Sequence, residues 1–140
     1  MEHIVDFVIR HWGLTALLAV NGGLLAYAFG VEEKGSLDPQ GATVLINQKD
    51  ALMLDIRTTG DFAKGHIIGA MNLPANGLGQ QLGILEKHKQ RPIIVSCRSG
   101  AQSSHACQTL RKAGFPQVYN LRGGILAWQN ANLPLTRKFK

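Results

Sequence analysis

The stretch "IIVSCRSGAQSS", residues 93–104, places a cysteine directly between an apolar run and a series of small polar residues. Residues 92–96 have the length and composition of a strand that is buried on both faces. Residues 103–113 have the composition of the helix that follows. The loop between them must turn tightly, and Gly100 supplies the backbone freedom for that turn. The stretch therefore predicts a strand, a loop and a helix, with Cys97 at the carboxyl end of the strand.

The predicted loop surrounds Cys97 with groups that favour a thiolate. Successive backbone N–H groups of a tightly curled loop form an anion-binding nest, and the N-terminus of the next helix adds positive potential. Arg98 adds a full positive charge next to the sulfur. These effects lower the pKa of a cysteine below its ordinary value of about 8.5. We therefore expect a nucleophilic Cys97, the alternative being a cysteine that serves only as small apolar packing.

Segments with the pattern of strands alternate with segments that have the pattern of helices along residues 37–135. Strands are predicted at residues 51–56, within 65–74, at 92–96 and at 117–121. Helices are predicted at residues 38–47, 61–64, 78–89, 103–113 and 123–131. This alternation predicts a small α/β domain over residues 37–135, with a parallel sheet and helices on both faces, followed by a basic tail at 136–140. Ligands of such sheets bind beyond the carboxyl ends of the strands, which is where Cys97 is placed.

The segment at residues 12–31 contains no charged residue in twenty positions. A membrane-spanning helix needs about 20 apolar residues. We therefore predict one N-terminal transmembrane helix at 12–31, preceded by a short tail at 1–11 and followed by a linker at 32–36. The alternatives are a buried helix of a soluble domain and a signal peptide cleaved near residues 26–28, although the acidic residues of the tail disfavour a signal peptide.

Positive charge is concentrated after this segment. Residues 35–140 hold thirteen of the fifteen Lys and Arg residues and five of the nine Asp and Glu residues, which gives a formal charge of +8. The positive-inside rule then predicts a single-pass protein whose C-terminal domain is cytoplasmic, and a basic domain is attracted to an anionic membrane surface. We expect no nucleic-acid partner, because no basic cluster is interleaved with aromatic residues.

Small residues recur at every fourth position of the apolar segment. Gly22, Ala26 and Gly30 form one such face, which in a membrane permits close contact between helices. Asn21 is polar and seeks an interhelical hydrogen bond in lipid. These residues leave open a second function, that of a membrane-anchored interaction or scaffold module with little or no turnover, whose partner is a membrane protein.

The chain contains two cysteines, Cys97 and Cys107. They lie ten residues apart, and no Cys-x-x-Cys or His-rich spacing accompanies them, so we expect neither a disulfide framework, nor a metal site, nor a cofactor. Unpaired thiols are typical of a reducing compartment. Cys107 lies inside a predicted helix without an activating feature, and we expect it to pack in the core rather than act as a resolving thiol.

Three stretches resemble the rhodanese-like single-domain family in order and spacing. They are "LDIRTTGDFAKGHIIGAMNLP" at residues 54–74, the cysteine stretch at 93–104, and "VYNLRGGILAWQ" at 118–129. The whole chain is similar to the membrane-tethered bacterial members of that family. The resemblance implies a rhodanese-like fold and a location in the bacterial inner membrane.

The resemblance also implies sulfur transfer through a persulfide. Cys97 would accept a sulfane sulfur from thiosulfate or a persulfide and pass it to cyanide, a thiol or an acceptor protein. A ring of amides would stabilise both the thiolate and the persulfide anion. The residues that would cradle the sulfur are Arg98, Ser99, Gly100, Ala101, Gln102 and Ser103. Many members have an arginine in the position of Gln102, so binding of dianionic thiosulfate is expected to be weaker here and the preferred donor stays open.

Residues outside the loop are expected to be structural. Asp55 and Arg57 match the Asp-x-Arg signature of the family, and paired charges at strand ends commonly brace the fold. His66 is expected to be a hydrogen-bonded structural histidine rather than a base. Leu126 and Trp128 are expected to lie in the core, on the last helix.

A cysteine phosphatase is the nearest enzymatic alternative, because its loop resembles this one. That chemistry requires an arginine six positions after the cysteine to hold the phosphoryl oxygens. The position is occupied by Ser103, so the sequence disfavours phosphatase and arsenate-reductase chemistry.

Overall fold

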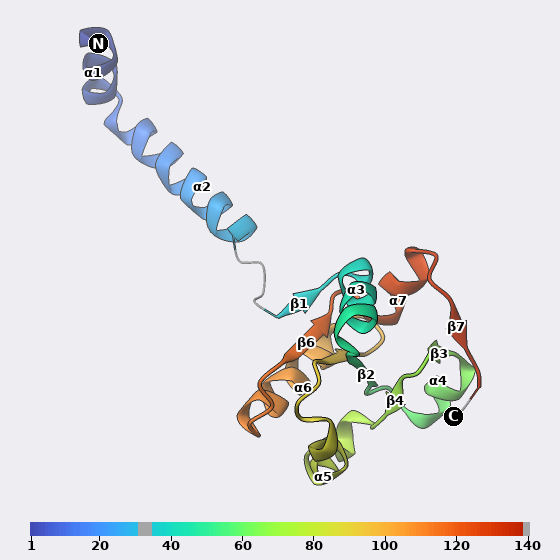
Figure 1. Cartoon of the computed structure of the whole chain (residues 1–140). Helices are drawn as coiled ribbons and strands as arrows, with labels where there is room; N and C mark the ends of the chain where they lie inside the picture. Colours follow the sequence, from blue (N-terminus) through green and yellow to red (C-terminus); the bar gives the residue numbers. More distant parts are fainter. Residues whose placement is uncertain (31–34, 139–140) are drawn as a thin grey trace. The chain divides into compact units, whose positions relative to one another are not determined.

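The computed structural model describes residues 1–30 and 35–138. The chain divides into two compact units, Met1–Lys34 and Gly35–Lys140. The larger unit contains a parallel five-stranded sheet with helices on both faces (Figure 1). The predicted α/β class is therefore confirmed.

The sheet has the strand order β1-β6-β5-β2-β4, and all its neighbouring strands are parallel. The strands are β1 (Ser36–Leu37), β2 (Leu52–Asp55), β4 (Met71–Asn72), β5 (Ile93–Ser96) and β6 (Val118–Leu121). A separate antiparallel pair joins β3 (His66–Ile67) to β7 (Leu135–Thr136). Ser36 and Thr136, placed by the sequence in the linker and the basic tail, thus pair in strands.

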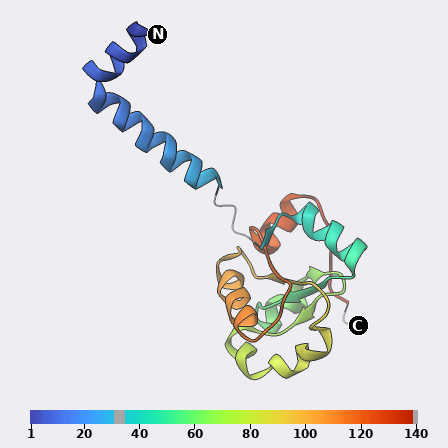
Figure 2. The ribbon, with the colours of Figure 1, turned by 60° about the vertical axis from the view of Figure 1, so that its left-hand side comes forward.

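Helices cover the two faces of the sheet in two groups. The helical segments are α3 (Pro39–Lys49), α4 (Thr59–Lys64), η1 (Ala75–Gln80), α5 (Leu82–Leu85), η2 (Glu86–His88), α6 (Ala101–Lys112) and α7 (Gly124–Asn130). One face packs against α3 and α7, and the other against α5 and α6 (Figures 1 and 2). Leu52 and Leu54 point to the second group whereas Met53, between them, points to the first. Burial on both faces explains why β2 and β5 are continuous apolar runs.

Two predicted elements differ from those in the structure. The brief strand expected within 65–74 is two strands, β3 and β4, which belong to different sheets. The helix expected over 78–89 is a series of short 3-10 and α turns. Gly79 and Gly83 lie inside that segment, and glycine is one of the least favourable residues for a helix.

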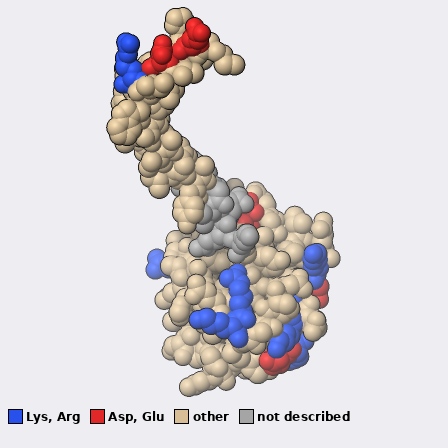
Figure 3. Space-filling model, turned by 90° about the vertical axis from the view of Figure 1, so that its left-hand side faces the viewer, with Lys and Arg blue, Asp and Glu red and all other residues tan. Residues whose placement is uncertain are grey.

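The N-terminal unit consists of α1 (Glu2–Arg10) and α2 (Trp12–Gly30). Among the described residues of this unit, the charged side chains are those of Glu2, Asp6 and Arg10, which lie on α1 (Figure 3). Within the described residues, no helix alone reaches the length and apolar character of a membrane span, whereas α1 and α2, bent by 90° at their junction, reach them as a pair. The tail predicted at 1–11 is thus largely helical, and Val31, the last residue of the predicted span, lies outside the described residues.

Candidate active site

Cys97 follows β5 directly, at the carboxyl edge of the central strands, and is only 2% exposed. Its Sγ accepts a hydrogen bond from the backbone N–H of Gly100 at 2.9 Å. Gly100 adopts a left-handed φ of 97°, which favours glycine because a Cβ is strained there. The chain then enters α6, whose N-terminus lies next to the sulfur. The structure therefore brings Cys97 to the start of a helix through one glycine turn.

A buried network of side chains surrounds the sulfur. The Oγ of Ser103, in the first turn of α6, lies 3.3 Å from the Sγ of Cys97. The same hydroxyl lies 2.5 Å from the Oδ1 of Asn120 and 3.1 Å from the carbonyl oxygen of Gly100. The Nδ2 of Asn120 donates to that carbonyl at 3.3 Å. Ser103 and Asn120, which come from α6 and β6, thus hold both the sulfur and the turn.

Burial and hydrogen bonding act on the thiol in opposite directions. Burial raises the pKa of Cys97, whereas hydrogen bonds from the Ser103 side chain and from the backbone N–H groups of Ser103, Gly100 and Ser99 lower it. The hydrogen bonds prevail, and the pKa lies below the ordinary value for cysteine. Arg98, whose charge we expected to contribute, is exposed and is not among these causes. The thiolate is therefore favoured by amides and a hydroxyl group.

The six residues predicted to cradle the sulfur divide into two groups. Gly100 and Ser103 make direct contacts with the sulfur, and Ser99 acts on it through its backbone N–H. Four of the six have exposed side chains: Arg98, Ser99, Ala101 and Gln102. The polar environment of the sulfur thus consists mainly of backbone groups and of residues held inside the fold.

The loop is attached to the start of α7 by backbone hydrogen bonds. The N–H of Ile125 donates to the carbonyl of Cys97 at 2.9 Å, and the N–H of Leu126 donates to the carbonyl of Arg98 at 3.2 Å. Gly124, with φ 59°, lies so close that a side-chain carbon there would overlap the carbonyl oxygen of Cys97. A glycine at this position therefore permits the contact that supports the loop.

Residues 38–131 match the family model of the Rhodanese-like domain. The chain belongs to the rhodanese-like family. It is 42% identical to the uncharacterized protein YibN of Escherichia coli (strain K12), over 98% of this chain and 99% of that protein. It is 40% identical to the thiosulfate sulfurtransferase GlpE of Shewanella oneidensis, over 60% of this chain and 81% of that enzyme. The solution structure of the Rhodanese-like domain from the Anabaena sp. Alr3790 protein superposes with a TM-score of 0.64 at 29% identity, covering 73% of this chain and 78% of that one.

The Asp-x-Arg signature of this rhodanese-like domain forms a buried ion pair at the end of β2. The Nη2 of Arg57 lies 2.8 Å from the Oδ2 of Asp55, which is fully buried, and also donates to the carbonyl of Gly65 at 2.7 Å. The N–H of Ile56 donates to the carbonyl of Ser96, the residue before the nucleophile, at 3.0 Å. The pair therefore stabilises the strand that lies next to the cysteine strand.

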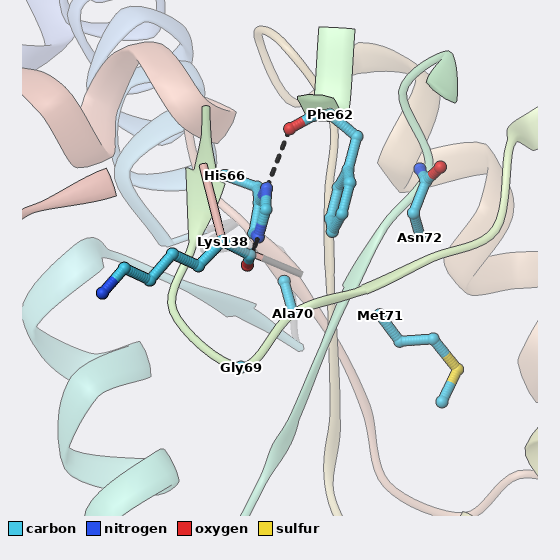
Figure 4. A pocket seen from close by; sticks show the side chains of 7 residues that line it. All are labelled: Phe62, His66, Gly69, Ala70, Met71, Asn72 and Lys138. Atoms are coloured by element: carbon cyan, nitrogen blue, oxygen red, sulfur yellow. Dashed lines mark hydrogen bonds between the residues drawn. The ribbon is translucent and has the colours of Figure 1, made fainter. Parts of the chain in front are cut away.

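His66 is held between two backbone carbonyls (Figure 4). Its Nδ1 lies 2.8 Å from the carbonyl oxygen of Phe62, and its Nε2 lies 3.1 Å from that of Lys138. The imidazole stacks on Phe62, with 3.7 Å between ring centroids. Together with Met71 and Asn72 these residues line a hollow of about 400 Å³. Both ring nitrogens are engaged with the backbone, which supports a structural role for His66.

Three apolar residues outside the loop were expected to lie in the core. Cys107, on α6, and Trp128, on α7, are both buried in the core. Leu126, which we expected in the core, is 46% exposed. That expectation was wrong because residue 126 faces outward on a helix only two turns long.

In the described part of the chain, His, Cys, Asp and Glu side chains form no group of three or more that would hold a metal.

Sequence reasoning missed Asn120 of the rhodanese-like site. Its segment, "VYNL", was assigned only to a strand. A polar residue in a strand that is otherwise buried was the available signal, because such a side chain requires a hydrogen-bond partner. Identifying Ser103 as that partner requires the position of β6 beside β5, where Asn120 pairs with Val95.

Proposed function

We propose that this chain is a sulfurtransferase that moves a sulfane sulfur from thiosulfate or a persulfide to a thiophilic acceptor, through a persulfide on Cys97. Membership of the rhodanese-like family and the likeness to a thiosulfate sulfurtransferase support sulfur transfer as the class of chemistry. The observation that carries the proposal is the buried Sγ of Cys97, 2.9 Å from the N–H of Gly100 and with a lowered pKa.

The reaction would proceed in two displacements at sulfur. In the first, the Cys97 thiolate attacks the sulfane sulfur of thiosulfate, a new S–S bond forms, and sulfite leaves with the electron pair of the broken bond. In the second, the acceptor thiolate attacks the outer sulfur, and the pair returns to Sγ. The donors from Gly100 and Ser103 are in place for the anion at each stage, so little reorganisation is needed.

The loop carries little positive charge to attract an anionic sulfur donor. Gln102 is exposed and neutral, so Arg98 is the one cation among loop residues 98–103. Thiosulfate carries two negative charges, and a single exposed cation attracts it only weakly in water. A persulfide donor therefore has to be tested beside thiosulfate.

Mass spectrometry of the intact chain tests the proposal. After treatment with thiosulfate or cysteine persulfide, the wild type and Cys107→Ser should each gain one sulfur atom, which dithiothreitol then removes. Cys97→Ser should gain none. Failure of the wild type to gain sulfur from either donor, or a gain retained in Cys97→Ser, would contradict the proposal.

We further propose that the N-terminal unit anchors the chain in the bacterial inner membrane in a single pass, with the rhodanese-like domain in the cytoplasm. The uncharged segment from Trp12 onward and the formal charge of +8 over residues 35–140 support this arrangement. A cysteine introduced at the exposed Lys112, in a Cys97→Ser background, tests the orientation. It should resist an impermeant thiol reagent in intact cells and react after lysis, whereas labelling in intact cells would contradict the orientation.

A membrane-anchored interaction module is the second candidate function. Gly22 and Ala26 are exposed on α2, and a side-chain carbon at Gly22 would meet no atom within 4 Å. This small-residue face, which we extend to Gly30, would admit a helix of a membrane-protein partner. Replacing the three residues by leucine should remove that partner from the purified complex while sulfur loading persists. An unchanged set of co-purifying membrane proteins would exclude this function.

A further inference from the structure

A second hollow, of about 220 Å³, lies beside the cysteine loop. Its lining includes Arg98, which directly follows the nucleophile, Lys64 of α4, and Ile125 and Leu126 of α7. The N–H groups of Ile125 and Leu126 bind the carbonyls of Cys97 and Arg98. One wall of the hollow and the cysteine loop are therefore held together by hydrogen bonds, so a group bound there lies next to the reacting residue.

The hollow carries positive charge that the protein leaves without a partner. Lys64 and Arg98 are exposed, and neither forms a salt bridge within residues 1–30 and 35–138. Arg57 also lines the hollow, but the buried carboxylate of Asp55 already compensates its charge. Asp61 is the acidic residue among the described lining residues. The two exposed cations exceed that single negative charge, so the hollow attracts an anion.

Part of the lining of the hollow is aliphatic. Ile125 belongs to that part, and Leu126 is 46% exposed, which leaves apolar surface that a ligand would cover. Arg137, a third cation, lies at the backbone of Lys64, because its Nε donates to the carbonyl of Lys64 at 3.2 Å. Cations and aliphatic side chains on one hollow favour an anionic group on a hydrocarbon stem. The volume lies below the range of about 300–1,000 Å³ that is usual for drug-sized ligands, so the hollow suits one small carboxylate.

We propose that this hollow binds the carboxylate of the acceptor, and that the protein therefore prefers carboxylate-bearing thiols as sulfur acceptors. This inference rests on the proposed persulfide chemistry. The acceptor thiolate attacks the outer sulfur of the Cys97 persulfide, and the bond between the two persulfide sulfurs breaks. The electron pair returns to Sγ, and the acceptor leaves as a persulfide. Its carboxylate stays on Lys64 and Arg98 throughout and does not react.

Single-turnover transfer by the full chain in detergent tests the preference. The persulfide form is mixed with mercaptopropionate, mercaptohexanoate or neutral mercaptoethanol, and each rate is corrected for the thiolate fraction of the acceptor. Exposed ion pairs contribute up to about 1 kcal/mol, or roughly fivefold, and Lys64→Glu both removes such a pair and adds repulsion. Of mercaptopropionate and mercaptohexanoate, the thiol that the wild type uses faster is the reference. We expect Lys64→Glu to slow transfer to it about tenfold and to leave the rate of transfer to mercaptoethanol unchanged. Asp61→Asn should accelerate transfer to the carboxylate acceptor about twofold.

Lys112→Glu is the matched control, because Lys112 is also exposed and the charge change is the same. It should leave the ratio of carboxylate to neutral acceptor rates unaltered. To distinguish a protein acceptor from a small thiol, transfer rates are compared for two peptides. In one the cysteine is flanked by glutamates, and in the other it is flanked by glutamines. Equal slowing of both thiol classes by Lys64→Glu, or slowing of neither, would overturn the inference.

A binding measurement separates this inference from the proposed function. If Cys97 fails to load sulfur, the persulfide mechanism is wrong, but the hollow remains testable with methylthiopropionate, an unreactive carboxylate. We expect this compound to shift the NMR signals of Leu126 in the wild type and in Lys112→Glu, and not in Lys64→Glu. The absence of any shift in the wild type would overturn the carboxylate site itself.

Discussion

At the residue scale, one hydroxyl group connects the sulfur of Cys97 to the amide of Asn120. The Ser103 hydroxyl has a single hydrogen, and the oxygens of Asn120 and Gly100 both lie within hydrogen-bond distance of it. When the thiol is protonated, it can donate to the Ser103 oxygen. When the thiol is ionised, the hydroxyl hydrogen can turn toward the sulfur, while the Asn120 amide still holds the Gly100 carbonyl. Ser103 is therefore the residue whose removal should affect the thiolate most directly.

Ser103→Ala should raise the pKa of Cys97, because it removes a hydroxyl donor that lowers it. A hydrogen bond contributes about 0.5–1.5 kcal/mol, so alkylation by iodoacetamide at neutral pH should slow roughly two- to tenfold. The pH dependence of the alkylation rate measures the shift. Ser104→Ala, one position along the same helix, is the control and should leave the profile unchanged. An identical profile for Ser103→Ala would contradict the assigned role of the hydroxyl.

The lowered pKa of Cys97 also predicts how stability depends on pH. A group whose pKa is lower in the folded state stabilises that state above its unfolded pKa, about 8.5 for cysteine, and this contribution is lost as the pH falls through the folded value. The free energy of unfolding of the wild type, minus that of Cys97→Ser, should therefore increase as the pH rises from about 5 to about 9. Urea denaturation across this range measures the difference. A constant or decreasing difference would contradict the prediction.

At the element scale, the active site depends on how α7 meets the cysteine loop. Two backbone hydrogen bonds join them, and Gly124 allows the approach. The strand next to the cysteine strand is stabilised separately by the buried pair of Asp55 and Arg57, which also binds the carbonyl of Gly65. The sulfur is therefore positioned by α7 and by the neighbouring strand β2, and a change in either contact should reduce the stability of the domain.

Gly124→Ala should destabilise the domain by about 2–4 kcal/mol, because the added carbon meets the Cys97 carbonyl and the residue has a left-handed φ. Urea denaturation gives the free energy of unfolding. Gly60→Ala is the control, since Gly60 lies in α4 with open space around it and no left-handed φ. Its stability should change by no more than about 1 kcal/mol. Equal effects of the two substitutions would contradict the proposed close contact.

At the scale of the whole molecule, the two units differ in what stabilises them. Both hydrophobic clusters are built from residues of the larger unit, on the two faces of one sheet. In the described part of the N-terminal unit, large apolar side chains such as Leu17 and Leu24 are exposed, because no other part of the chain covers them. The larger unit therefore contains its own core, whereas the described part of the smaller unit has apolar surface that a membrane or a partner protein could cover.

A fragment of residues 35–140 should fold without the N-terminal unit. Because both clusters lie within it, its urea midpoint and the pH profile of Cys97 alkylation should match those of the full chain in detergent. In cell fractionation the full chain should be in the membrane fraction and the fragment in the supernatant. An unfolded fragment would contradict the independence of the domain, and a full chain found in the supernatant would contradict the proposed anchor.

The elements predicted from the sequence are those that carry a local signal in neighbouring residues. The central strands β2 and β5 were predicted from apolar runs, and α3 was predicted from Asp38 and Pro39. In the structure Asp38 caps α3, because its side chain accepts from the N–H of Gly41 at 2.7 Å. Strands β1 and β7 have two residues each, too few to carry a pattern, and β3 and β4, equally short, were expected as one strand. Their pairing depends on segments distant in the sequence, such as β3 with β7.

The sequence by itself determined the α/β class, the family, and the place of Cys97 between a buried strand and a glycine turn, because these follow from patterns among neighbouring residues. Only the tertiary structure decided which groups reach the sulfur. Ser103 and Asn120 are 17 residues apart, and they meet because β6 lies beside β5 beneath α6. Strand order and register set such contacts, and no local period encodes them. The same holds for Lys64, which the fold places on one hollow with Arg98.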